Sequence, residues 1–282
     1  MQYGTHLFAT ERSIQPDEFA RLSEERGFES VWFSEHTHIP VSFLSSGKRQ
    51  PPLPDYYWQT YDPFIASTIA ATVTNSIKIG TGVSLVLEHD AISLAKTVAT
   101  VDQISSGRFI FGVGAGWLAE EMENHGVRYR SRYRQLDEQI AAMKVIWTEA
   151  EAEYHGEFVS FSRIKSYPKP YQSPNPPIIG GGGTGTKTLE FIENHCDGWM
   201  PILGYPEWSE IKAGIADINQ RLDQTDREPG SIECSIFCWS SPDERTIDDM
   251  EAHGIKKIVI SLEAKNREES LPLLDEFTEL MS

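Results

Sequence analysis

Two glycine-rich turns are the features of this sequence that most directly suggest ligand-binding chemistry. Gly112, Gly114 and Gly116 lie in the run FGVGAGW, and residues 180–183 are the four glycines of PPIIGGGG. Each turn follows a short apolar run typical of a buried strand and precedes a segment with helical periodicity. Because glycine has no side chain and tolerates positive φ, such a turn brings backbone N–H groups close to a ligand.

The second turn is predicted to hold an anionic group. Its amides are unobstructed, and a helix is expected to begin near Lys187 with Thr184 or Thr186 as its cap, so the helix dipole favours a cofactor phosphate there. The predicted cofactor-binding residues are Gly181, Gly182, Gly183 and Thr184. The alternative is a turn that only permits tight packing. The turn also matches G-x-G-x-x-G, but no acidic residue follows about 20 positions on, so a dinucleotide fingerprint is not predicted.

Glu35, His36 and His38 form the second informative group, in the segment SEHTH. Imidazole exchanges protons near neutral pH, so His36 with Glu35 is suited to hold the polar edge of a cofactor ring or to handle a proton. A metal-dependent hydrolase also uses H-x-H, but it needs further histidines and an aspartate at later strand ends. His195 and His253 precede their strands, so no metal site is predicted. The remaining alternative is a pair of solvated loop histidines.

Eight strand candidates alternate with helical segments, which is the pattern of an α/β fold of the (β/α)8 TIM-barrel type. The predicted strands cover residues 3–8, 30–34, 77–83, 109–113, 177–180, 198–201, 232–239 and 257–261. Active sites of such barrels lie at the C-terminal ends of the strands, where both glycine turns and the SEHTH segment fall. A length of 282 residues suits one barrel, and no linker divides it. We therefore predict a single domain over residues 1–282.

Several helices have clear boundary signals. The first is predicted over residues 17–26. Asp90 is predicted to cap the helix AISLAKTVATVDQIS, and two further helices are expected over residues 133–149 and 271–281.

Acidic and aromatic residues near the GAGW turn can be explained by a structural role or by a functional one. Glu120 and Glu121 open the next helix, and their favourable interaction with its dipole is sufficient to explain them. Trp32 lies inside a strand and is predicted to be a core residue. Trp117 directly follows a glycine turn at a strand end, where its indole could pack against the flat ring of a cofactor.

Two stretches interrupt the alternation of strands and helices. Residues 40–63 contain five prolines and five aromatic residues. Because disordered segments are poor in aromatics, this insertion is predicted to be an ordered lid or partner surface. Residues 151–177 are predicted to form a short hairpin, EYHGEFVSF, and then a proline-rich crossing. Both insertions are expected to decorate the barrel.

Charge and composition exclude several classes of protein. A net charge of −17 and a pI near 4.9 argue against nucleic-acid binding, which needs a basic face. The N-terminus lacks a signal-peptide pattern and no apolar run reaches 18 residues, so a membrane role is not predicted and a cytoplasmic location is expected. The three cysteines form no disulfide framework, and Cys234 and Cys238 are expected to be buried thiols.

With the strand ends laid out, the chain resembles the bacterial-luciferase-like monooxygenase superfamily, which consists of flavin- or deazaflavin-dependent TIM barrels. The resemblance covers nearly the whole length. It rests on the segments SVWFSEHTHIP, IKIGTGVSLVLEHDAISLAKTVATVDQISSGRFIFGVGAGW and YPKPYQSPNPPIIGGGGTGTKTLEFIENHCDGWMP. The proline-rich lid and the DPF at residues 62–64 are most similar to the branch that uses coenzyme F420, a deazaflavin.

The resemblance implies roles for individual residues. The bond between Gly82 and Val83 matches a non-proline cis peptide that forms a bulge behind the central cofactor ring. Glu35 and His36 match an acidic residue and histidine near the ring and the substrate. The residues that match the cofactor-contacting segment after the fourth strand are Ala115, Gly116 and Trp117. The residues that match the phosphate donors are Gly181, Gly182 and Gly183.

The chain departs from the family pattern in three places. Leu118 replaces an asparagine that often follows the GAGW turn, and Ala91 replaces a proline that often starts the helix after the third strand. Many deazaflavin members have a carboxylate where Trp117 stands, which leaves the proton donor open.

The resulting hypothesis is an F420-dependent oxidoreductase that transfers a hydride to or from a small organic substrate, with His36 handling a proton. A monooxygenase that uses reduced FMN and oxygen, with a separate reductase as its partner, is the alternative within the family. A metal-dependent hydrolase and a catalytically silent binding barrel are the alternatives outside it. Family habit also implies a homodimer.

Overall fold

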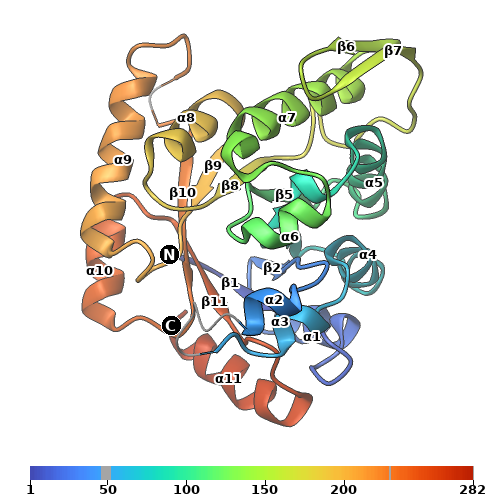
Figure 1. Ribbon diagram of the computed structural model, residues 1–282. Helices are drawn as coiled ribbons and strands as arrows, with labels where there is room; N and C mark the ends of the chain where they lie inside the picture. Colours follow the sequence, from blue (N-terminus) through green and yellow to red (C-terminus); the bar gives the residue numbers. More distant parts are fainter. Residues whose placement is uncertain (46–51, 229, 282) are drawn as a thin grey trace.

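The computed structural model describes residues 1–45, 52–228 and 230–281. Eight parallel strands form a closed barrel in the order β3-β2-β1-β11-β10-β9-β8-β5, and β3 pairs with β5 to close it (Figure 1). Their bounds are β1 Gln2–Leu7, β2 Ser30–Phe33, β3 Lys78–Thr81, β5 Phe109–Gly114, β8 Ile178–Gly181, β9 Gly198–Met200, β10 Glu233–Cys238 and β11 Lys257–Ser261. The predicted TIM-barrel fold is therefore confirmed.

A helix follows each barrel strand and covers the outside of the barrel (Figure 1). These outer helices are α1 Pro16–Glu25, α4 Pro63–Val73, α5 Ala91–Ile104, α7 Arg132–Thr148, α8 Thr186–His195, α9 Trp208–Leu222, α10 Glu244–Ala252 and α11 Arg267–Glu279. Each presents apolar residues to the strands, because both faces of a parallel sheet must be covered by apolar side chains. Among the described residues, none of the helices has the length and apolar character needed to cross a membrane.

The third barrel strand is interrupted at Gly82 and Val83, whose peptide bond is cis as the resemblance implied. The strand resumes as β4, Ser84–Leu85, which pairs with β5, and continues into a 3₁₀ turn, η1, Val86–Glu88. Gln139 Nε2 of α7 donates hydrogen bonds to the carbonyl oxygens of Val86 and His89, so the outer helix pins this turn.

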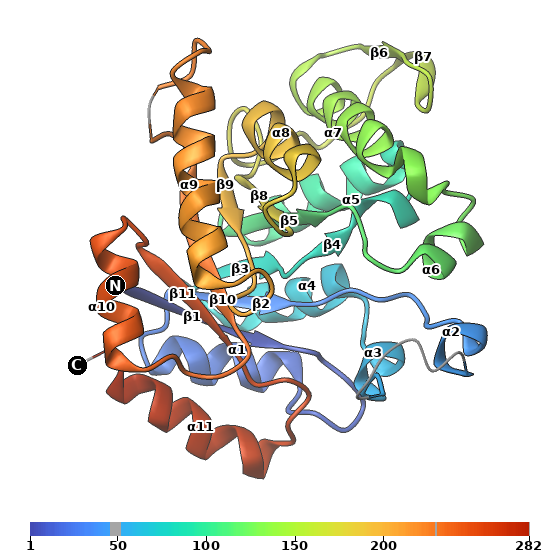
Figure 2. The same cartoon turned by 60° about the vertical axis from the view of Figure 1, so that its left-hand side comes forward.

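Short helices gather at the carboxyl ends of the strands, on the right in Figure 2. They are α2 Val41–Ser45, α3 Tyr56–Gln59 and α6 Ala119–Asn124. A small apolar cluster holds part of the predicted lid against the barrel, and its buried members are Phe8, Ile39, Leu53, Tyr57 and Leu118. Residues 46–51 of the predicted lid lie outside the described residues. The second predicted insertion contains an antiparallel hairpin of β6, Ala152–His155, and β7, Ser160–Ile164.

Two predicted helix starts need correction. The last helix, α11, begins at Arg267 rather than near residue 271, because Asn266 and Glu269 form a capping box at its start. Neither Thr184 nor Thr186 caps α8: the N-cap is Gly185, with no side-chain hydrogen bond. By contrast, Asp90 caps α5 as predicted, by accepting from the N–H of Ser93.

Trp32 fills the centre of the barrel, as its predicted core position requires, and is only 1% exposed. Its indole N–H donates to the hydroxyl of Ser30 at 2.9 Å. Gly80 on the neighbouring strand leaves room for the ring, because a Cβ there would lie 2.4 Å from the indole Cε3. A Cβ on Gly112 would lie 1.9 Å from the carbonyl oxygen of Thr81. Part of the glycine pattern thus serves barrel closure rather than ligand binding.

We expect Gly80→Ala to lower the free energy of unfolding by about 1–3 kcal/mol, because the added methyl overpacks the barrel centre. Trp32→Phe in the same chain should recover part of that loss by removing the clashing ring edge. Urea unfolding measures both effects. Gly183→Ala is the control, since a Cβ there meets nothing closer than 3.9 Å. A Gly80→Ala protein as stable as the parent would contradict this packing.

Candidate active site

A cavity of about 140 Å³ opens at the carboxyl ends of the barrel strands. It brings together residues from β2, the β3–β4 interruption, the GAGW turn and the end of β8. The sequence-predicted site residues in its lining are Glu35, His36, Gly82, Val83, Trp117, Gly181 and Gly182. Its other walls are mostly apolar or aromatic: Phe8, Tyr57, Leu85, Met200, Ile202, Phe237 and Trp239, with Ser34 as a polar member. Ala115, Gly116, Gly183 and Thr184 lie outside this lining.

His36 is buried and is held by the carboxylate of Glu121, a residue for which the sequence predicted no chemical role. Its Nδ1 lies 2.8 Å from Glu121 Oε2, with both side chains less than a tenth exposed. The His36 ring meets Trp117 edge-to-face at a centroid distance of 5.9 Å. This geometry rules out a solvated loop position for His36. It also corrects the dipole explanation of Glu121, whose side chain points inward from the first turn of α6.

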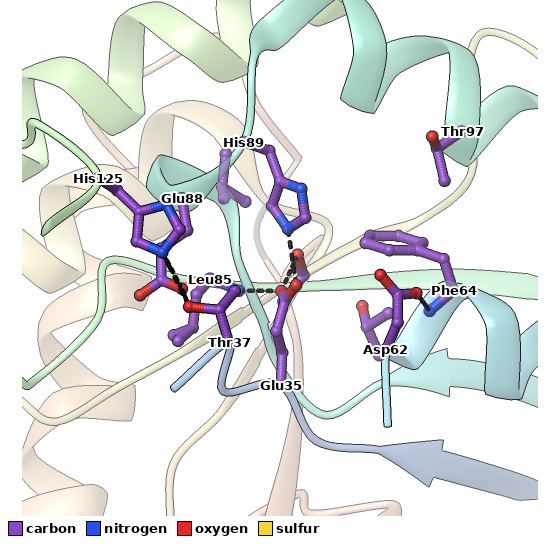
Figure 3. Close-up of polar contacts among 12 residues, drawn as sticks. Glu35, Thr37, Asp62, Phe64, Leu85, Glu88, His89, Thr97 and His125 are labelled. Carbon is purple, nitrogen blue, oxygen red and sulfur yellow. Dashed lines mark hydrogen bonds and ion pairs between the residues drawn. The ribbon is translucent and has the colours of Figure 1, made fainter. Parts of the chain in front are cut away.

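Glu35 is an anchoring carboxylate rather than a free one (Figure 3). Its Oε2 accepts from the Ser84 hydroxyl at 2.8 Å and the Leu85 N–H at 2.7 Å, and its Oε1 lies 2.6 Å from His89 Nε2. Burial lowers the pKa of His89, but the hydrogen bond and charge of Glu35 outweigh it and the pKa is raised overall. Glu35 thereby ties the end of β2 to the strand that resumes after Val83.

His6, at the end of β1, supports the same interruption from inside the barrel. Its Nε2 lies 2.7 Å from the Ser34 hydroxyl, which donates to the Gly82 carbonyl at 3.1 Å, and its Nδ1 lies 3.0 Å from Ser261 Oγ. Burial lowers the pKa of His6 to about 3, so its ring is neutral at physiological pH. Its sequence signal is limited to a histidine near the end of a predicted strand.

The glycine turn after β8 lies beside the interrupted strand. A Cβ on Gly181 would lie 2.9 Å from the Val83 side chain, so glycine is needed for the two turns to approach. Gly182 has φ of +127°, and its carbonyl accepts from the Trp199 indole at 3.2 Å. The backbone at Gly183 and Gly185 stays open, because a Cβ on either would meet nothing closer than 3.9 Å.

Two other features of the described chain bear on alternative sites. No group of three histidine, cysteine or carboxylate side chains within residues 1–45, 52–228 and 230–281 is arranged to hold a metal ion. A larger cavity, of about 560 Å³, lies at the amino ends of the strands. Two of its three lysines are paired, since Lys257 lies 3.3 Å and Lys78 2.8 Å from Glu29. We therefore place the chemistry at the carboxyl ends.

The free energy of unfolding should fall as pH drops from about 6.5 toward 3, because His6 has a depressed pKa in the folded protein and takes up a proton more readily when unfolded. His6→Asn should be less stable at pH 7 but should lose this part of the acid dependence. Thermal unfolding at a series of pH values measures both. His155→Asn, which replaces an exposed histidine, is the control. An unchanged acid slope in His6→Asn would refute the assignment.

The luciferase-like monooxygenase family profile matches residues 15–280. An uncharacterised protein of Mycobacterium tuberculosis is 42% identical over 209 residues, which are 71% of this chain and 72% of that protein. The F420-dependent glucose-6-phosphate dehydrogenase of Kineococcus radiotolerans is 26% identical over 243 residues, 83% of this chain and 66% of that enzyme. The FMNH2-dependent dimethylsulfone monooxygenase of Pseudomonas putida is 39% identical over 130 residues, 45% of this chain and 35% of that enzyme.

Solved structures share the fold at low sequence identity. A monooxygenase from Streptomyces bottropensis has a TM-score of 0.79 and 19% identity, with coverage of 99% of this chain and 98% of that one. An F420-dependent secondary alcohol dehydrogenase has a TM-score of 0.78 and 18% identity, with coverage of 99% and 97%. The chain belongs to the luciferase-like monooxygenase family.

Proposed function

We propose that the protein is an oxidoreductase that uses coenzyme F420 to transfer a hydride to or from a small organic substrate. The observation that carries the proposal is the His36–Glu121 pair, which opens onto a mostly apolar cavity between the Gly82–Val83 interruption and the glycine turn after β8. The cavity therefore places the His36 ring against mostly apolar walls, which suits a reaction in which a histidine moves a proton while the cofactor moves the hydride.

The residues present fit a flat ring with a phosphate-bearing tail. Val83 and Gly181 offer a surface without projecting polar groups, and Trp117 offers an aromatic wall that is 43% exposed. The open backbone of Gly183 leads to the first turn of α8, whose free N–H groups and dipole favour an anion. When bound, the deazaflavin would supply the hydride chemistry.

Within this proposal, Glu121 orients the His36 ring and fixes which nitrogen faces the cavity. His36 Nδ1 is engaged by Glu121, so Nε2 is the atom left to exchange a proton with the substrate. Glu121 thus supplies a carboxylate at the site although Trp117 stands where many deazaflavin enzymes have one. The aromatic residues around the cavity exclude water from the reacting groups.

The two relatives named above that use F420 and FMNH2 align with different fractions of the chain. The F420-dependent relative aligns over 83% of the chain, whereas the FMNH2-dependent relative aligns over 45%. Reduced FMN with oxygen is accordingly the second candidate. A homodimer, a cytoplasmic location and, for flavin chemistry, a separate reductase remain parts of the proposal, and none of the residue roles above depends on them.

Titration of the cofactor-free protein with F420 and with FMN, followed by tryptophan fluorescence, tests the proposal. We expect F420 to quench the fluorescence at lower concentration than FMN, because Trp117 lines the predicted ring site. Gly183→Ala should weaken binding about tenfold, equal to about 1.4 kcal/mol, without changing the melting temperature. Tighter binding of FMN would favour the monooxygenase, and binding of neither would reject both.

His36→Asn should bind the cofactor within a few-fold of the parent affinity but lose about 100-fold or more in turnover, because only the proton-handling group is removed. A panel of uncharged alcohols and ketones, followed by the absorbance of the cofactor, identifies a substrate for the assay. Glu121→Gln should lose less, about 10-fold, because the histidine remains but is less firmly oriented. His38→Asn is the matched control. Full turnover in His36→Asn would contradict the assigned role.

A further inference from the structure

A third buried glutamate lies behind the cavity and takes no part in the roles described above. Glu88 ends η1, and its side chain is only 1% exposed. Its Oε2 accepts from the Thr37 hydroxyl at 2.9 Å and lies 3.5 Å from His125 Nε2 (Figure 3). Its Oε1 is buried and has no hydrogen-bond partner among the described residues. Burying an ionised carboxylate that has one oxygen without a hydrogen bond costs much free energy of desolvation. Burying the neutral acid in the same place costs much less.

The hydrogen bonds around Thr37 leave no donor for that bare oxygen. Asn124 Nδ2 donates to His38 Nε2, so the proton of this ring sits on Nδ1 and is donated to Thr37 Oγ1. His125 Nε2 also lies 2.8 Å from Thr37 Oγ1. Thr37 Oγ1 accepts both of these contacts, so its single hydroxyl proton is donated in a hydrogen bond to Glu88 Oε2.

The surroundings of Glu88 are rich in negative charge. The titratable groups that face it are Glu35 from the segment after β2, His89 next to it in the chain, Glu121 from α6, and His125 directly after that helix; His38 contacts Thr37, the hydrogen-bond donor to Glu88. Glu35 accepts three hydrogen bonds, and Glu121 is contacted by His36 at 2.8 Å and by the backbone N–H of His38 at 3.5 Å. Glu88 accepts only one hydrogen bond, from Thr37, which is the fewest of the three carboxylates.

We propose that Glu88 is a positioning residue that stays uncharged, which keeps a further negative charge away from the Glu35 and Glu121 carboxylates that hold His89 and His36. When Glu88 ionises, it adds a negative charge near the carboxylate of Glu121 that orients His36. The consequence for catalysis rests on the proposed function, but the electrostatic coupling itself does not.

The direction of the pKa shift at Glu88 agrees with this geometry. Burial, and after it the charge of Glu121, raise the pKa of Glu88 to about 8 although the hydrogen bond from Thr37 opposes them. Because the pKa in the folded protein lies above that of an ordinary carboxyl, the stabilising contribution of protonated Glu88 is complete at acid pH. It is lost as pH rises through about 8.

Histidine ring shifts measured by NMR in the cofactor-free protein test the coupling, with each signal assigned by a His→Asn variant. We expect the rings of His36 and His125 to report a step with a midpoint near pH 8, and this step should be absent in Glu88→Gln. Glu123→Gln, an exposed glutamate on α6, should keep the step. Absence of the step in the parent protein, or its persistence in Glu88→Gln, would overturn the proposal.

Glu121→Gln gives a reciprocal test that does not require the Glu88 variant to fold. Because the charge of Glu121 raises the pKa of Glu88, its removal should move the step seen at His125 to lower pH. Thermal unfolding adds a second readout: the melting temperature of Glu88→Gln relative to the parent should rise between pH 5 and pH 9. An unmoved step in Glu121→Gln, or a difference in melting temperature that does not change with pH, would count against the coupling.

These readouts separate the inference from the proposed function. If neither cofactor binds but the step near pH 8 behaves as expected, the coupling stands and the proposed function fails. If F420 binds and is turned over but the step is unchanged in Glu88→Gln, the proposed function stands and the coupling is wrong. If both stand, the pH profile of turnover should lose its inflection near pH 8 in Glu88→Gln.

Discussion

The indole of Trp32 is the constraint on which the barrel and its site depend. A ring of that size fits in the centre only because Gly80 on the adjoining strand leaves space beside it, and glycine at position 112 lets β5 approach the Thr81 carbonyl of β3. Closure of β3 against β5 then determines where the strands end. The strand ends in turn set the positions of the interruption at Gly82 and Val83 and of the SEHTH segment. A packing requirement at the centre therefore controls the geometry of the cavity.

Around the cavity, buried polar groups bind the strand ends to one another. Glu35 joins β2 to β4, and His6 with Ser34 supports the Gly82 carbonyl from the centre of the barrel. Such groups are stable only when their hydrogen bonds are made, because water is excluded from them. The network consequently restricts how far the cavity can deform. The bare oxygen of Glu88 is an exception in this network, and it marks where a proton takes the place of a missing donor.

Much of the fold and part of the site could be predicted from residue patterns. The strand candidates and the cap at Asp90 depend on local periodicity and turn chemistry, which act over a few residues. His36 was identifiable because it follows a strand directly. Glu121 was not, since a glutamate in the first turn of a helix already has a local explanation, and its inward orientation depends on how α6 packs on the barrel.

The residue pattern alone is enough to predict the barrel and to place glycine turns and a histidine at the ends of its strands. These predictions follow from spacing over a few residues, which does not depend on how the chain is folded. Three features exist only in the folded chain: Glu121 pairs with His36, Glu35 is an anchor, and Glu88 is buried with one oxygen unpaired. Burial and pairing arise between residues about 50 to 85 positions apart, and their energies exist only after the strands have closed and excluded water.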